Sequence, residues 1–167
     1  MTETIATTPM EKSWFEIEMV GSAFQSRWST CSDTANLVAQ VLSLDSPDSQ
    51  RFASQVSSIT NELFELAFRT GRCAGTLKVN AGAPEGGIFF QLEFDAGDNV
   101  RRIVSEVEQA RLAGMNQYLE LLGREEAAPT LLSLIELTVV HKVSLAVRDL
   151  GQMRVGLDAS LHRVMEE

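Results

Sequence analysis

The sequence has few of the residues that cross-link small domains or hold metals. Its 167 residues include two cysteines, Cys31 and Cys73, and two histidines, His141 and His162. Two cysteines do not make a disulfide framework, and these two are not at the spacing of a zinc site. Neither histidine has an acid or cysteine partner at a recognisable spacing, so we predict no metal ligands and no catalytic triad. We expect free thiols, one of which could be buried as a small hydrophobic residue.

Basic residues and long apolar runs are also scarce. Lys and Arg number 14 against 23 Asp and Glu, which gives a net charge of −9. Nucleic acids are bound by concentrated Lys and Arg, so this balance argues against such a partner. No stretch approaches the roughly 18 uninterrupted apolar residues of a membrane span. The chain also lacks the basic start and apolar run of a secretory signal. We therefore expect a cytoplasmic protein without membrane contact.

The remaining composition is that of an ordinary globular protein. Hydrophobic residues make up 44% of the chain and charged residues 22%, and the length suits one domain with a sizeable core. Residues 1–12 are rich in threonine and have no periodicity, which predicts a flexible tail. We expect residues 13–167 to form a single domain.

The strongest helical signal lies between Arg51 and Arg72. Six apolar residues recur there at helical spacing and predict one buried face: Phe52, Val56, Ile59, Leu63, Leu66 and Ala67. Asn61 and Glu65 point the other way, with Glu62 at the border. Phe64 and Phe68 lie one turn apart on this polar side, which predicts a second contact with another helix of the chain or with a partner.

The other segments predict a mixture of strands and helices. Period-two alternation predicts five strands, over residues 13–20, 76–80 and 87–95 and around 143–147 and 153–159. Further helices are expected over residues 23–44, 98–112 and 115–122 and from Pro129 onward, with Leu112 on the apolar face of its helix. Ser46 and Pro47 predict the start of the central helix, Gly71 its end, and Asp98 the cap of the next helix.

The resulting order of elements is β-α-α-β-β-α-α-α-β-β. Neighbouring strands that are joined by short turns must run antiparallel. One face of the strand over residues 87–95 is wholly apolar, so helices must cover it. We predict an α+β fold: a two-layer α/β sandwich with a largely antiparallel or mixed sheet of about five strands and helices on one face.

This order resembles the GHKL ATPase superfamily, and most closely its small anti-sigma-factor serine kinases and related bacterial partner-switching kinases. The family's central helix reads E-L-x-x-N-A, and this chain reads Glu62-Leu63-Phe64-Glu65-Leu66-Ala67. In the family the Asn holds magnesium and the Glu positions or activates a water or hydroxyl. Leu66 stands where that Asn should be, and leucine has no oxygen to offer a metal. A shifted frame gives Asn61 the Asn role but places Ser57 at the acidic position.

The other two nucleotide motifs of the family are also degraded here. Asp95-Ala96-Gly97-Asp98 keeps the Asp and one Gly of the adenine-binding Asp-x-Gly-x-Gly. At the place of the glycine-rich lid stands Thr130-Leu131-Leu132-Ser133-Leu134, whose bulky side chains would keep a phosphate from the backbone. If nucleotide binding is retained, the resemblance implies that Asn61, Glu62, Glu65 and Asp95 contact ATP and Mg.

Our leading hypothesis is a non-catalytic, degenerate GHKL-like module that acts through protein–protein contacts in bacterial signalling, without a cofactor. In that hypothesis Leu66, Leu131 and Leu132 fill the former nucleotide pocket. The resemblance also implies a homodimer through the N-terminal strand and first helix. One alternative is an active serine/threonine kinase or anti-sigma-type switch protein with a non-standard site. A second is a small-molecule sensor or another enzyme, with a pocket lined by residues such as Phe24, Phe90 and Met153.

Overall fold

The fold is given by a computed structural model, which describes residues 15–44, 46, 48–72, 75–83 and 87–162. The predicted tail, residues 1–12, lies outside the described residues, as does Cys73. Within the described ranges, no helix combines the length and the apolarity that crossing a bilayer requires.

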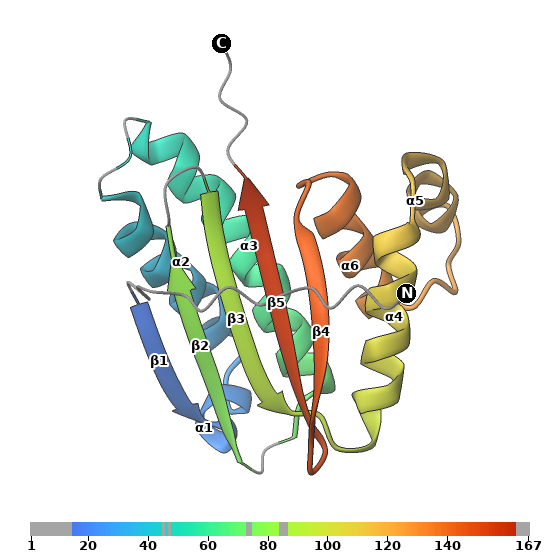
Figure 1. Cartoon of the computed structure of the whole chain (residues 1–167), viewed down its shortest axis with the longest axis horizontal. Helices are drawn as coiled ribbons and strands as arrows, with labels where there is room; N and C mark the ends of the chain where they lie inside the picture. Colours follow the sequence, from blue (N-terminus) through green and yellow to red (C-terminus); the bar gives the residue numbers. More distant parts are fainter. Residues whose placement is uncertain (1–14, 45, 47, 73–74, 84–86, 163–167) are drawn as a thin grey trace, which may run out of the picture.

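Five strands form one antiparallel sheet in the order β1-β2-β3-β5-β4 (Figure 1). Their bounds are β1 Phe15–Val20, β2 Thr76–Gly82, β3 Gly87–Asp95, β4 Ser144–Gly151 and β5 Arg154–His162. Each neighbouring pair is antiparallel, so the predicted α+β sandwich is confirmed. The edge strands are β1 and β4.

The helices lie on one side of this sheet (Figure 1). Their bounds are α1 Gly21–Gln25, α2 Ser29–Ser43, α3 Ser49–Thr70, the short 3-10 turn η1 Gly97–Asn99, α4 Val100–Leu112, α5 Met115–Leu122 and α6 Pro129–Val139. Helices α2 and α3 pack together behind β1, β2 and β3, while α4 and α6 pack together beside β4. Helix α5 projects at the outer corner of the molecule, next to α6.

The core lies between the sheet and α3. All six residues of the predicted stripe of α3 are buried, as are the alternate residues Ile88, Phe90, Leu92 and Phe94 of β3. Cys31 of α2 belongs to the same core and is 1% exposed. Burial raises the pKa of its thiol to about 11, with the charge of Glu65 as a second cause.

The opposite face of the sheet carries an ion-pair network centred on Arg148. The guanidinium of Arg148 donates from Nε and Nη2 to the two carboxylate oxygens of Asp158, at 3.1 and 3.0 Å, and Nη2 reaches Glu93 at 3.4 Å. Gly156 lies beneath this guanidinium, and a Cβ there would come within 2.9 Å of Arg148 Nη2. The glycine therefore lets one arginine lie flat across β5 and bridge β4 to β3.

The expected helix over residues 23–44 was wrong, because the chain breaks between α1 and α2. Before the break, Gln25 Nε2 at the end of α1 donates to the carbonyl of Gly71 at 2.7 Å. After it, Trp28 packs on Phe68, with ring centroids 4.7 Å apart, and Phe24 packs on both Phe64 and Phe68. The second contact predicted for Phe64 and Phe68 is thus with the same chain.

Three smaller boundary predictions were also wrong. The cap of α3 is Asp48, whose side chain accepts from the Arg51 N–H at 3.2 Å, rather than Ser46. Asp98 lies inside η1 and does not cap α4. The last hairpin turns at Gln152 and Met153, so β4 extends to Gly151 instead of ending near residue 147, and Met153 lies in the turn and not in β5. Both turn residues have positive φ, 50° and 63°, as a two-residue type I′ turn requires.

Candidate functional site

The polar side of α3 holds three of the four residues predicted to contact nucleotide. Asn61 Nδ2 donates to Glu65 Oε1 at 3.0 Å, and Arg69 Nη2 lies 3.5 Å from Glu65 Oε2. Glu65 also lies near Cys31, since its charge contributes to the raised thiol pKa. Asn61 and Glu65 are therefore engaged with each other on the α2 side of the helix.

Glu62 faces α6 instead. Its carboxylate is partly buried and accepts a hydrogen bond from Ser133. Burial raises the pKa of Glu62, and the charges of Glu65 and Glu136 raise it further, whereas the Ser133 bond and the charge of His141 oppose the shift. The side chain is thus poised to take up a proton more readily than an ordinary glutamate.

Tyr118 attaches α5 to the same polar cluster. Its hydroxyl donates to Glu136, and its pKa is raised first by burial and then by the charge of Glu136. Sequence reasoning missed Tyr118, Ser133 and Glu136. The one available signal was that Ser133 and Glu136 are polar, lie three residues apart in the mostly apolar α6 and so share a face of that helix.

The three leucines predicted to replace the nucleotide groups differ in burial. Leu66 is 2% exposed and belongs to the core. Leu131 is partly buried and packs against the core, and Leu132 is also partly buried. The position that would carry the magnesium ligand is therefore an apolar side chain inside the protein.

The first turn of α6 carries a buried hydrogen bond between Thr130 and Glu106. Thr130 Oγ1 donates to Glu106 Oε2 at 2.7 Å, and both side chains are at least nine-tenths buried. Arg102 Nε lies 4.0 Å from the other carboxylate oxygen of Glu106. In the resembled family a phosphate approaches this helix start, so a fixed carboxylate here opposes an anion electrostatically.

Asp95, the fourth predicted nucleotide residue, lies in a turn. Its Oδ1 accepts from the Gly97 N–H at 3.0 Å, and its backbone carbonyl accepts from the Arg72 N–H at 2.8 Å. Gly97 has φ +54° and is covered by the Arg72 side chain, so a Cβ at residue 97 would clash with it. The hydrogen bonds that the structure describes for Asp95 serve this turn, and none joins it to Asn61, Glu62 or Glu65.

No group of three or more His, Cys, Asp or Glu side chains within the described part of the chain is arranged to hold a metal ion. The three residues named for a sensor pocket also differ in burial and do not form a common pocket wall. Phe24 and Phe90 are each 3% exposed and packed in the core, whereas Met153 is 50% exposed in the turn between β4 and β5.

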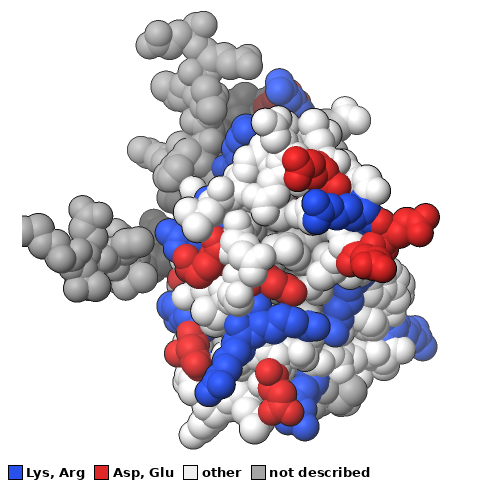
Figure 2. Space-filling view, turned by 90° about the vertical axis from the view of Figure 1, so that its right-hand side faces the viewer, with Lys and Arg blue, Asp and Glu red and all other residues white. Residues whose placement is uncertain are grey.

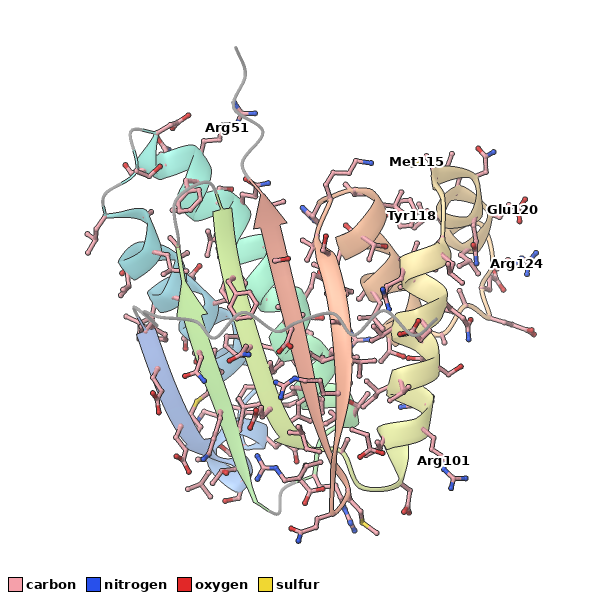
Figure 3. All side chains as sticks on the ribbon, in the orientation of Figure 1. Arg51, Arg101, Met115, Tyr118, Glu120 and Arg124 are labelled. Atoms are coloured by element: carbon pink, nitrogen blue, oxygen red, sulfur yellow. The ribbon has the colours of Figure 1, made fainter. Side chains whose placement is uncertain are left out.

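Helix α5 exposes an apolar stripe. The stripe consists of Met115, Leu119 and Leu122, each about half exposed, and Leu112 at the end of α4 is 88% exposed. Leu112 was expected on the buried face of α4, and this was wrong. Figure 3 shows Met115 and Tyr118 at different sides of α5, with Tyr118 turned toward α6. Figure 2 shows that acidic and basic side chains are interspersed on this side of the molecule, with uncharged surface between them.

A hollow of about 470 Å³ lies at the N-terminal end of α5. It is lined by the end of α4, the start of α5, the end of α6 and the start of β4: Arg111, Ala113, Gly114, Met115, Thr138, Val139, Lys142, Val143, Ser144 and Leu145. Lys142 has φ +57°, a conformation that is uncommon for a residue other than glycine. No sequence signal identified this hollow.

Comparisons of the chain with models of protein families, with curated proteins and with solved structures found no match.

Proposed function

We propose that this protein is a non-catalytic, degenerate GHKL-like module that acts in bacterial regulation by binding a protein partner. The observation that carries the proposal is the stripe of Met115, Leu119 and Leu122, three large apolar side chains exposed on one face of α5 at positions i, i+4 and i+7. Soluble proteins rarely leave such a continuous apolar surface without a binding role.

Two further features support a role without ATP chemistry. Leu66 is buried and offers no oxygen where the resembled kinases place their magnesium ligand. At the start of α6, Glu106 and Thr130 hold a carboxylate where a phosphate would have to approach. Both features act on the same expected site, because α3 and α6 pack against each other.

Thermal unfolding with and without Mg-ATP tests the absence of nucleotide binding. A ligand at about 100 times its dissociation constant adds roughly 2.7 kcal/mol, which would raise the Tm of a chain of this size by about 5 to 10 °C. We expect no shift. A shift of that size that is lost in Glu62→Ala or Asn61→Ala would overturn the non-catalytic proposal.

Partner binding is tested by comparing two leucine variants in extracts of the source cells. Leu119→Ser interrupts the stripe, and Leu44→Ser changes a leucine that is 78% exposed outside it. We expect a partner retained by the wild-type chain and by Leu44→Ser to be lost with Leu119→Ser. Equal retention by both variants would contradict the role of the stripe.

The alternative of an ATP-dependent serine/threonine kinase has one observation in its favour. Glu62 is a partly buried carboxylate with a raised pKa, and a candidate base of this kind needs its pKa tuned toward neutrality. Transfer of phosphate from ATP to a serine or threonine of the captured partner, abolished by Glu62→Gln, would establish this alternative. We expect no transfer.

A further inference from the structure

The hollow at the start of α5 has the size of a small-molecule site. Its volume of about 470 Å³ falls in the range of about 300 to 1,000 Å³ that is typical for such sites. Four segments far apart in sequence contribute its walls, namely the ends of α4 and α6 and the starts of α5 and β4. It therefore exists only in the folded chain.

The charged residues that line the hollow are both basic. Arg111 and Lys142 line it, and none of the ten lining residues is acidic, in a chain whose net charge is −9. Arg111 Nη1 contacts Glu108 at 3.0 and 3.2 Å, which leaves the other guanidinium N–H groups of Arg111 for a ligand. Lys142 has no ion-pair partner among the described residues.

The hydroxyl groups of the lining add a donor. Thr138 Oγ1 donates its hydrogen to the Ala110 carbonyl at 2.9 Å, with the Ile135 carbonyl at 3.0 Å as an alternative acceptor. Ser144 is exposed and makes no side-chain hydrogen bond within the described part of the chain, so its hydroxyl can donate to a ligand. The groups available for binding are thus two cations and a hydroxyl donor.

Apolar side chains form the rest of the wall. Val139, Val143 and Leu145 are 4 to 6% exposed and form a fixed surface, while Met115 at the rim is 47% exposed. Lys142 keeps a left-handed backbone conformation where α6 passes into β4. Such a conformation costs free energy and is often kept where it serves a site.

We infer that this hollow binds a small organic anion, one carboxylate or phosphate group on a short, partly apolar body. The anion contacts Arg111, Lys142 and Ser144, and the body lies against Val139, Val143 and Met115. The inference goes beyond the proposed partner binding, because it concerns a free small molecule and needs neither Leu119 nor Leu122. The lining residues of α6 are in its last turn, at the opposite end of the helix from the pair of Glu106 and Thr130.

The test is a titration of the full chain with 3-phenylpropionate and phenyl phosphate, followed by amide and methyl NMR shifts. We expect saturable shifts at Gly114, Met115 and Ser144. The neutral 3-phenylpropanamide should bind at least about tenfold more weakly, since one charge-assisted contact is worth about a factor of ten. Equal binding of the amide, or no shift up to about 10 mM of either anion, would overturn the inference.

Two variants and a matched control locate the binding. Arg111→Gln and Lys142→Asn should each weaken binding about tenfold, and asparagine suits the left-handed backbone at residue 142. Arg101→Gln removes a charge from the other end of α4, far from Met115 (Figure 3), and should bind like wild type. Unchanged binding in both hollow variants, each with wild-type Tm, would contradict the assignment.

Inorganic phosphate separates an organic ligand from nonspecific anion binding. If it binds as tightly as phenyl phosphate, the apolar wall contributes nothing and the inference fails. Leu119→Ser, which interrupts the stripe but lies outside the hollow, should bind the anions normally. Anion binding without partner capture would support this inference and contradict the proposed function. Partner capture without anion binding would support the proposed function and contradict this inference.

Discussion

Glu62 shows how one side chain can link three helices electrostatically. It belongs to α3, accepts from Ser133 of α6, and is near Glu136, which in turn accepts from Tyr118 of α5. Burial and two neighbouring carboxylates make its ionised form less favourable than in the unfolded chain. The cost of that ionisation is a property of the folded state and can be measured.

We predict that Glu62 makes the protein less stable as the pH rises. Because the folded-state pKa is raised above the ordinary value of 4.5, the folded state binds a proton more tightly than the unfolded state does. The stabilisation is present below pH 4.5 and is lost as the pH rises through the folded pKa. Glu62→Gln should lack this loss, so its free energy of unfolding should improve relative to wild type between pH 4 and pH 7.

The measurement is urea unfolding of wild type and Glu62→Gln at several pH values. Glu120→Gln is the control, because Glu120 is exposed on α5 and is not among the charges that shift the pKa of Glu62. A stability difference between wild type and Glu62→Gln that does not change with pH would contradict the prediction.

At this scale the sequence predicted the helix face of a residue but not its distant neighbours. Helical phase placed Asn61 and Glu65 on the polar side of α3 and Glu62 at its border, and all three are partly buried there. The partners Ser133, Glu136 and Tyr118 lie about 55 to 75 residues later in the chain. Their contact depends on how α6 packs on α3, which no local pattern contains.

At the scale of the element, helix α5 is the least anchored helix of its length or longer. None of its residues is buried, and glycines stand at both of its ends, Gly114 and Gly123. Tyr118 and Leu121 are the side chains that pack toward the core. A helix held by so few contacts should open locally more often than the rest of the domain.

We predict that residues 115–122 exchange their amide hydrogens faster than α3, and that Tyr118→Phe speeds this exchange further. The substitution removes the hydrogen bond to Glu136, worth about 1 kcal/mol, which corresponds to about a fivefold change in local opening. Hydrogen-exchange mass spectrometry of the two proteins provides the measurement.

The environment of Tyr118 can be checked independently, because the chain contains one tyrosine. Ultraviolet titration of the native protein should give Tyr118 a pKa above its ordinary value of 10.0. Exchange in residues 115–122 that is unchanged in Tyr118→Phe would show that the Glu136 contact does not hold α5.

Strands and long helices were predictable at this scale, and the breaks between them were less so. The apolar alternation of β3 and the stripe of α3 are strong local signals, and both are buried as predicted. The end of α1 depends instead on Gln25 reaching Gly71, a contact 46 residues away. The turn at Gln152 and Met153 lacks the Asn-Gly that usually marks a type I′ hairpin, so its position was hidden.

For the whole molecule, the order of elements and the short turns were sufficient to predict a sandwich with an antiparallel sheet. They could not predict which apolar residues would stay outside. Leu112 follows Val107 by five residues, about 140° around the helix, so it lies away from the buried face of α4 and is 88% exposed.

The proposed homodimer belongs to this scale. Strand β1 is at the edge of the sheet, and its outer edge is not paired within the described residues. Val20 at its end is 59% exposed, and Trp28 beside α1 is 46% exposed. An open strand edge with adjoining apolar side chains is suited to pairing with a second chain.

We predict a mass of about 37 kDa in light scattering, twice the chain mass of 18.4 kDa, at concentrations near 100 µM. Trp28→Ser should raise the dissociation constant of the dimer about tenfold, because it removes the largest exposed apolar group beside β1. Leu37→Ser is the matched control, since Leu37 is 47% exposed on α2. The Trp28 ring also packs on Phe68, so both variants must be compared below their Tm. A mass of 18.4 kDa at this concentration would contradict a dimer through the edge of β1. The stripe of α5 would then be the remaining candidate for a binding surface.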